Sequence, residues 1–130
     1  MKRIRIKGYK SIKEIDLDLL QINIFIGANG SGKSNFLFFF DFLKQIYKKN
    51  LREFVALKGI NSFLHKGDKI TSEINTHLYF KGTNEYSFTL KKGDTGLIFT
   101  HEGMWYGNNP YLNNPIEIAS FINRNKELNN

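Results

Sequence analysis

The stretch IFIGANGSGKSN, residues 24–35, places three glycines, a lysine and two serines directly after an apolar run. Residues 27–34 match the spacing G-x-x-x-x-G-K-[ST] at every fixed position, a match expected by chance in about one chain of this length in a few hundred. The match follows a predicted strand and opens a predicted helix, which is the context that this spacing needs. The stretch therefore predicts a phosphate-binding loop.

Each residue type in this loop has a chemical reason. The glycines allow positive φ, so that backbone N–H groups can converge on an anion, and the following helix adds the partial positive charge of its N-terminus. Lys33 is predicted to reach the β- and γ-phosphates, and the Ser34 hydroxyl to bind Mg²⁺. The predicted phosphate-binding residues are Gly27, Ala28, Asn29, Gly30, Ser31, Gly32, Lys33 and Ser34.

Strands are predicted before the loop. Residues 2–8 and 12–19 alternate apolar and polar side chains, and Gly8 to Ser11 separates them, which predicts an antiparallel hairpin. Residues 21–26 contain consecutive apolar residues instead. That pattern predicts a strand buried on both faces.

A helix is predicted directly after the loop. Aromatic and aliphatic residues recur at spacings of three and four from near Lys33 until the lysines at 48–49, which predicts a core-facing stripe. The residues of that stripe are Phe36, Phe39, Phe40, Leu43 and Tyr47.

The rest of the chain is predicted to be mainly β. Residues 51–57 are compatible with a helical extension, and three alternating segments over 72–80, 85–92 and 95–106 predict an antiparallel meander. Asn114 and Pro115 are typical of a helix start, followed by apolar residues at helical spacing.

Composition indicates a globular chain with a basic surface. It has 130 residues, 41% of them hydrophobic, and no cysteine, so one core can form without disulfide or thiolate chemistry. No apolar run is long enough to span a membrane and the amino terminus lacks a secretory signal, so we expect a cytoplasmic protein without a membrane partner. The excess of 19 Lys and Arg over 12 Asp and Glu fits either a polyanionic partner or a solvated basic surface.

The amino-terminal third resembles a known family. IRIKGYKSIKEIDLDL at residues 4–19, followed by LQINIFIGANGSGKSNFL at residues 20–37, resembles the amino terminus of RecF/SMC-like, ABC-type P-loop ATPases. This group includes the AAA family ATPases of overcoming-lysogenization-defect and related anti-phage systems. The matching residues are the turn Tyr9-Lys10-Ser11 and the pattern N-x-x-x-G-x-N-G-x-G-K-S-N that ends at Asn35.

The resemblance implies an α/β fold, the amino-terminal lobe of an ABC-type P-loop NTPase with a β-hairpin, a Walker A strand-loop-helix and an antiparallel β-meander. It implies ATP and Mg²⁺ as cofactors and a role in DNA repair or phage defence, and it adds Asn35 and Lys10 to the nucleotide site. We expect one partial domain over residues 1–130, with hairpin and loop over 2–50, a β lobe over 70–106 and a helix over 115–128.

Sequence motifs that such ATPases use for hydrolysis are absent from this sequence. No run of four apolar residues ends in Asp or Glu, and in GLIFTHE the residues Thr100 and His101 interrupt the run before Glu102. No catalytic residue is therefore predicted, and we expect no efficient ATPase activity from this chain alone. We expect the amino-terminal part of a longer ATPase, with a carboxy-terminal lobe, a second subunit, a homodimeric full-length form and DNA as candidate partners.

Three functional hypotheses are open from the sequence. The chain is an ATP-binding lobe of an ABC-type ATPase, a non-hydrolysing nucleotide-binding module that regulates a partner, or a basic nucleic-acid-binding fragment in which the loop is only a turn. The three histidines lie far apart in the sequence and predict no metal site. Trp105 and Tyr106 are compatible with base stacking, but packing at a strand end is the more common role.

Overall fold

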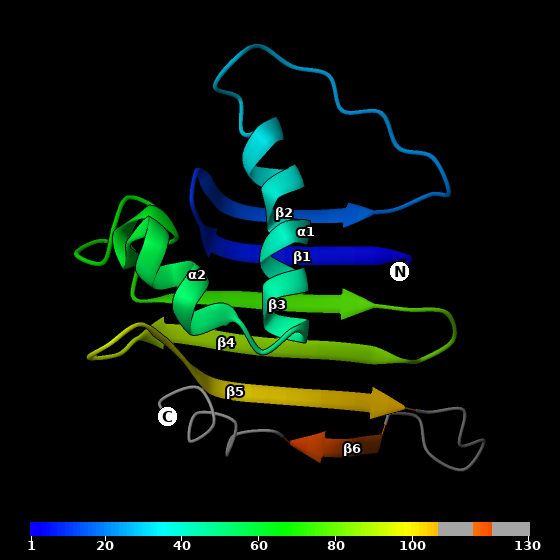
Figure 1. The fold of residues 1–130 in the computed structure, drawn as a ribbon. Coiled ribbons are helices and arrows are strands. Elements are labelled where there is room, and N and C mark those ends of the chain that lie inside the picture. Colours follow the sequence, from blue (N-terminus) through cyan, green and yellow to red (C-terminus); the bar gives the residue numbers. More distant parts are fainter. Residues whose placement is uncertain (107–115, 121–130) are drawn as a thin grey trace.

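The chain folds into an antiparallel β-sheet with its helices on one face (Figure 1). The computed structural model describes residues 1–106 and 116–120. The strand order is β2-β1-β3-β4-β5-β6, and each neighbouring pair is antiparallel. The elements are β1 (Arg3–Tyr9), β2 (Ile12–Asp18), α1 (Lys33–Tyr47), α2 (Leu51–Lys58), the 3₁₀ helix η1 (Ile60–Ser62), β3 (Glu73–Tyr79), β4 (Glu85–Lys92), β5 (Leu97–Tyr106) and β6 (Ile116–Ser120).

The hairpin and the meander are confirmed. In the β1–β2 pair Ile4 lies opposite Leu17 and Ile6 opposite Ile15, so the predicted apolar positions share one face of the sheet. The meander of β3, β4 and β5 continues that face, since β3 also pairs with β1. The period of two thus identified both the strands and their buried side.

Helix α1 crosses the sheet and covers this apolar face (Figure 1). Its predicted extent is confirmed, but its buried stripe is Phe36, Phe39, Phe42 and Ile46, whereas Phe40 is 37% and Tyr47 84% exposed. Over its first ten positions the helix carries apolar residues on nearly every side. Periodicity alone therefore does not determine which side faces the sheet. Packing against the sheet selects the stripe.

The chain reverses after α1 and returns to the β1–β2 turn. Lys49 has a left-handed φ of 58°, which separates α1 from α2. The loop after α2 then reaches the turn, where Tyr9 and Leu64 form a β-bridge. Residues 59–72 therefore lie beside the β1–β2 turn at one end of the sheet.

The strand predicted at residues 21–26 is not formed. These residues lie outside every helix and strand, and Ile24 and Ile26 are 80% and 91% exposed. Such a strand needs parallel neighbours on both sides, and every pairing among residues 1–106 and 116–120 is antiparallel. Phe25 packs on α1, with its ring centre 4.9 Å from that of Phe36, but no strand leads directly into the loop and helix in the described structure.

The helix predicted over residues 115–128 is wrong where the structure describes that range. Residues 116–120 form β6, which pairs with β5, and the other residues of the range lie outside the described part. Strand β5 extends over ten residues and offers backbone donors and acceptors on its outer edge. Pairing with that edge outweighs the local helix signal of Asn114 and Pro115.

Gly8 in β1 requires glycine for two reasons. Its φ is +81°, and a Cβ atom there would lie 2.3 Å from the Glu73 carbonyl oxygen. We expect Gly8→Ala to lower the free energy of unfolding by about 1–3 kcal/mol, because β1 must shift away from β3. Gly96→Ala is the control, since its Cβ meets no heavy atom within 4 Å. Urea unfolding measures both, and an equal loss in the two variants would contradict the prediction.

Candidate functional site

The loop of residues 27–32 lies at the edge of the sheet beyond β2 and leads directly into α1 (Figure 1). Gly30 and Gly32 have left-handed φ values of 83° and 95°. The Phe36 amide donates to the Gly32 carbonyl at 2.9 Å and so starts the helix. Residues 29–35 line a pocket at this helix start, where amides without helical partners remain for a ligand.

Lys33 bridges the two ends of the loop. Its ammonium donates a hydrogen bond to the carbonyl oxygen of Gly27. A Cβ atom on Gly27 would lie 2.7 Å from Ser31 Oγ, so a side chain there would enter the space that the loop encloses. The Ser34 hydroxyl is exposed on the first turn of the helix. A cation and a hydroxyl therefore stand at a tight glycine turn, and this arrangement fits a Mg²⁺-bound polyphosphate.

Ser11 of the β1–β2 turn is a site residue that the sequence prediction did not include. Asn35 Nδ2 donates to Ser11 Oγ at 2.8 Å, and a Cβ atom on Gly32 would lie 3.2 Å from the same oxygen. The family resemblance included the Tyr9-Lys10-Ser11 turn, but only the structure shows which of these three side chains lies beside the loop.

Lys10 points toward a different neighbour. Its ammonium lies 5.0 Å from the centre of the Phe63 ring, and burial together with the charge of Lys58 lowers its pKa. Its carbonyl accepts a hydrogen bond from His65 Nδ1 at 2.8 Å. The Lys10 side chain thus packs against the segment after α2, while Ser11 contacts the phosphate loop.

A groove separates the loop from the sheet edge. Its walls are β2 on one side and the stretch from Ile24 to Gly27 on the other, with Lys33 and Phe36 of α1 between them. The lining is largely apolar. The candidate loop thus adjoins a surface that is open to a planar or aliphatic group.

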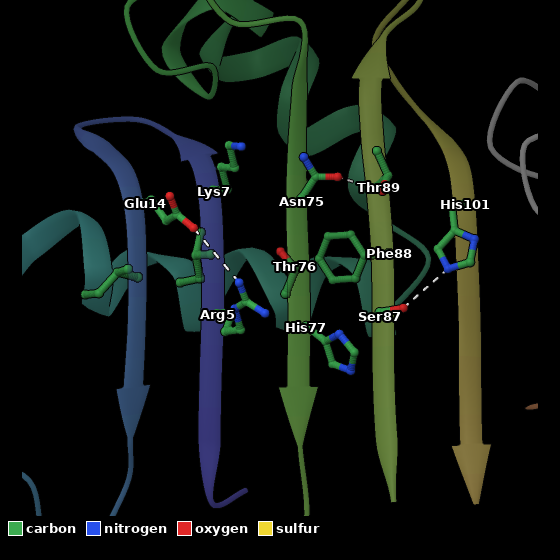
Figure 2. A pocket seen from close by; sticks show the side chains of 12 residues that line it. Arg5, Lys7, Glu14, Asn75, Thr76, His77, Ser87, Phe88, Thr89 and His101 are labelled. Carbon is green, nitrogen blue, oxygen red and sulfur yellow. Dashed lines mark hydrogen bonds and ion pairs between the residues drawn. The ribbon is translucent and has the colours of Figure 1, made fainter. Parts of the chain in front are cut away.

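A second hollow lies on the sheet face opposite α1 (Figure 2). Several of its polar groups pair with one another: Thr89 donates to Asn75 at 2.9 Å, and Ser87 lies 3.3 Å from the His101 ring. Within the described residues, no three His, Asp or Glu side chains are grouped so as to hold a metal ion. The left-handed glycines and Lys33 assign the candidate site to the loop.

Two residues weighed from the sequence make contacts within the sheet. Glu102 is 1% exposed within β5, and its carboxylate accepts a hydrogen bond from the Tyr86 hydroxyl at 2.6 Å. The Trp105 ring lies over Gly103, with its centre 6.3 Å from that of His77. The side chain of Tyr106 lies outside the described part. None of the described helices is long and apolar enough to cross a membrane.

Comparison with known proteins shows the class of protein to which this fold belongs. The family model of the AAA ATPase domain matches residues 1–130, and the chain belongs to this family. It is also similar to the tungstate uptake system ATP-binding protein TupC of Campylobacter jejuni, with 46% identity over 55 residues. That match covers 42% of this chain and 17% of the relative's length. Family membership indicates ATP binding.

Proposed function

We propose that this chain binds Mg-ATP through residues 27–34. The observation that carries the proposal is the glycine turn with its lysine: Gly30 and Gly32 are left-handed, and the Lys33 ammonium lies across the loop on the Gly27 carbonyl. A phosphate is a stronger acceptor for this ammonium than a neutral carbonyl, because the hydrogen bond then joins opposite charges. Phosphate binding would therefore displace the lysine from Gly27 and open the loop.

The other residues of the site have defined roles in this proposal. The amides at the start of α1 would hold the phosphates, and the exposed Ser34 hydroxyl would bind Mg²⁺. When bound, the metal would neutralise phosphate charge. Asn35 would fix the helix start to the β1–β2 turn through Ser11.

We propose that nucleotide binding by this chain alone is not followed by efficient hydrolysis. The sequence lacks the apolar strand ending in acidic residues that positions the attacking water in such ATPases. Calorimetric titration with Mg-ATP and with Mg-GTP, followed by an assay of phosphate release, tests binding, base preference and turnover separately. No heat and no melting shift with either nucleotide would overturn the proposal and favour the loop as a mere turn.

Ser11 and Lys10 are distinguished by a paired substitution. We expect Ser11→Ala to weaken Mg-ATP binding by about twofold to tenfold, because loss of one hydrogen bond to Asn35 costs about 0.5–1.5 kcal/mol. Lys10→Ala is the matched change one residue earlier, at a side chain that packs on Phe63. Isothermal titration measures both. A larger loss in Lys10→Ala would return Lys10 to the nucleotide site and contradict the role given to Ser11.

We also propose that further ATPase-domain polypeptide, from the same longer protein or a second subunit, covers the exposed apolar side chains of residues 22–26 and of the outer side of α1, which carries Leu37 and Phe38. Ile22, Ile24 and Ile26 are 82%, 80% and 91% exposed, and Leu37 and Phe38 are 56% and 51% exposed. Ile24 and Ile26 border the groove beside the phosphate loop. Parallel strands pairing with residues 22–26 would bury it and supply the neighbours that the predicted strand lacks. A role of the assembled ATPase in DNA repair or phage defence is the finer form of this proposal.

A further inference from the structure

The fold gathers lysines from separate parts of the chain at one end of the sheet. Lys7 and Lys13 flank the β1–β2 turn, and Lys66 belongs to the segment that returns to this turn after α2 (Figure 1). The bridge between Tyr9 and Leu64 holds the two segments together. We call the surface formed by Lys7, Lys13, His65 and Lys66 the basic end.

The basic end is hollowed, and several hydrogen-bond donors are among the groups that line it. A single pocket is bordered by its four members together with Gly8, Ile70, Thr71, Ser72, Glu73 and Asn75. Figure 2 shows Lys7 and Asn75 at the same end of the sheet. His65 is fixed in place because its Nδ1–H donates to the Lys10 carbonyl at 2.8 Å. Ammonium, hydroxyl and amide groups, together with the Glu73 carboxylate, thus surround one depression on the surface.

The carboxylates nearest to this pocket already have other partners. Glu73 lies 3.4 Å from the Lys91 ammonium and accepts a hydrogen bond from Asn75 at 3.1 Å. Asp68 is paired with Lys92. Across residues 1–106 and 116–120, Lys7, Lys13 and Lys66 form no ion pair. Lys13 and Lys66 therefore keep their charge without an ion-pair partner in the described protein, while Lys7 interacts at longer range with the Glu73 carboxylate that lines the same pocket.

The backbone at this end adopts an unfavourable conformation. Lys10 and Lys66 have φ values of 49° and 57°, in the left-handed region that favours glycine. Non-glycine residues there cost about 1–3 kcal/mol and occur most often at functional sites. Lys66 lines the pocket and Lys10 lies in the adjacent β1–β2 turn, so the backbone strain is found at the same end of the sheet as the positive charge.

We propose that the basic end binds the phosphate backbone of a nucleic acid. Its cations lie on exposed side chains from separate strands and loops, which suits successive phosphates of a polymer better than one small anion. A membrane surface is less suited, because Ile70 is the only large apolar side chain among the described residues that line the pocket. None of the pocket's residues lines the pocket of residues 29–35, and of its residues Lys13 alone also borders the groove beside the loop.

The test compares two triple variants of equal net charge. The first carries Lys7→Ala, Lys13→Ala and Lys66→Ala. The control carries Lys44→Ala, Lys48→Ala and Lys81→Ala at exposed positions outside this pocket. Fluorescence anisotropy with a labelled DNA duplex, at salt concentrations from about 50 to 200 mM, gives the affinity and its salt dependence. Melting curves verify that both variants are folded.

We expect the first variant to bind the duplex at least about tenfold more weakly. The slope of log affinity against log salt concentration should become shallower by about 2.7, which is about 0.9 for each lost phosphate contact. The control should change affinity by less than about twofold, as should Lys33→Ala, which removes only the nucleotide site. Equal losses in both triple variants would overturn the proposal. So would competition by inorganic phosphate at equal phosphate concentration, or binding to anionic lipid vesicles without binding to DNA.

Discussion

Lys33→Ala is expected to abolish the stabilisation that Mg-ATP gives to the wild-type chain. At a nucleotide concentration of about 100 times the dissociation constant, binding to the folded state adds about 2.7 kcal/mol to the free energy of unfolding. Lys33 supplies the ammonium at the loop, and alanine leaves the phosphates without a side-chain cation there. The measurement is the melting temperature with and without Mg-ATP.

Lys44→Ala is the matched control for this prediction. It removes an exposed lysine of the same helix, so both variants lose one positive charge. Without nucleotide, we expect both to unfold within about 0.5 kcal/mol of the wild type, because exposed substitutions rarely cost more. An undiminished Mg-ATP shift in Lys33→Ala would remove the nucleotide from the loop, and an equal loss in Lys44→Ala would assign the effect to general charge.

The parts of this molecule that were predictable from the sequence depend on local chemistry. Positive φ at Gly30 and Gly32 follows from glycine itself, and the position of the loop before α1 follows from spacing. The register of β1 and β2 follows from a period of two across a short turn. Each of these features is determined by residues within about twenty positions of one another. Arg3, for example, donates hydrogen bonds to Asp16, thirteen residues later in the β1–β2 hairpin.

The parts that were not predictable depend on which strands are present as neighbours. Residues 21–26 have the composition of a buried strand but no parallel partner in the described structure, and they remain exposed. Residues 116–120 have a helix signal but lie beside the outer edge of β5, and they form a strand. Whether such a segment forms a strand thus depends on whether the edge of another strand is available to pair with it.

The rotation of α1 gives the second large prediction. Phe38 and Phe39 are adjacent and identical in chemistry, yet Phe39 is 0% exposed and Phe38 is 51% exposed. The Phe39 ring centre lies 5.0 Å from that of Tyr9, whose turn carries Ser11, and 5.8 Å from that of Phe42. Phe39 therefore connects the helix that carries the loop to the turn that contacts it.

Phe39→Ala is expected to lower the free energy of unfolding by about 3–5 kcal/mol, because it leaves a cavity between α1 and the sheet. Phe38→Ala is expected to change it by less than about 1 kcal/mol, since half of that ring is already in water. Urea unfolding followed by circular dichroism measures both. Equal losses would mean that α1 has a different rotation. If the outer side of α1 is covered by further ATPase polypeptide, Phe38→Ala should instead weaken that association, because its ring lies on the covered surface.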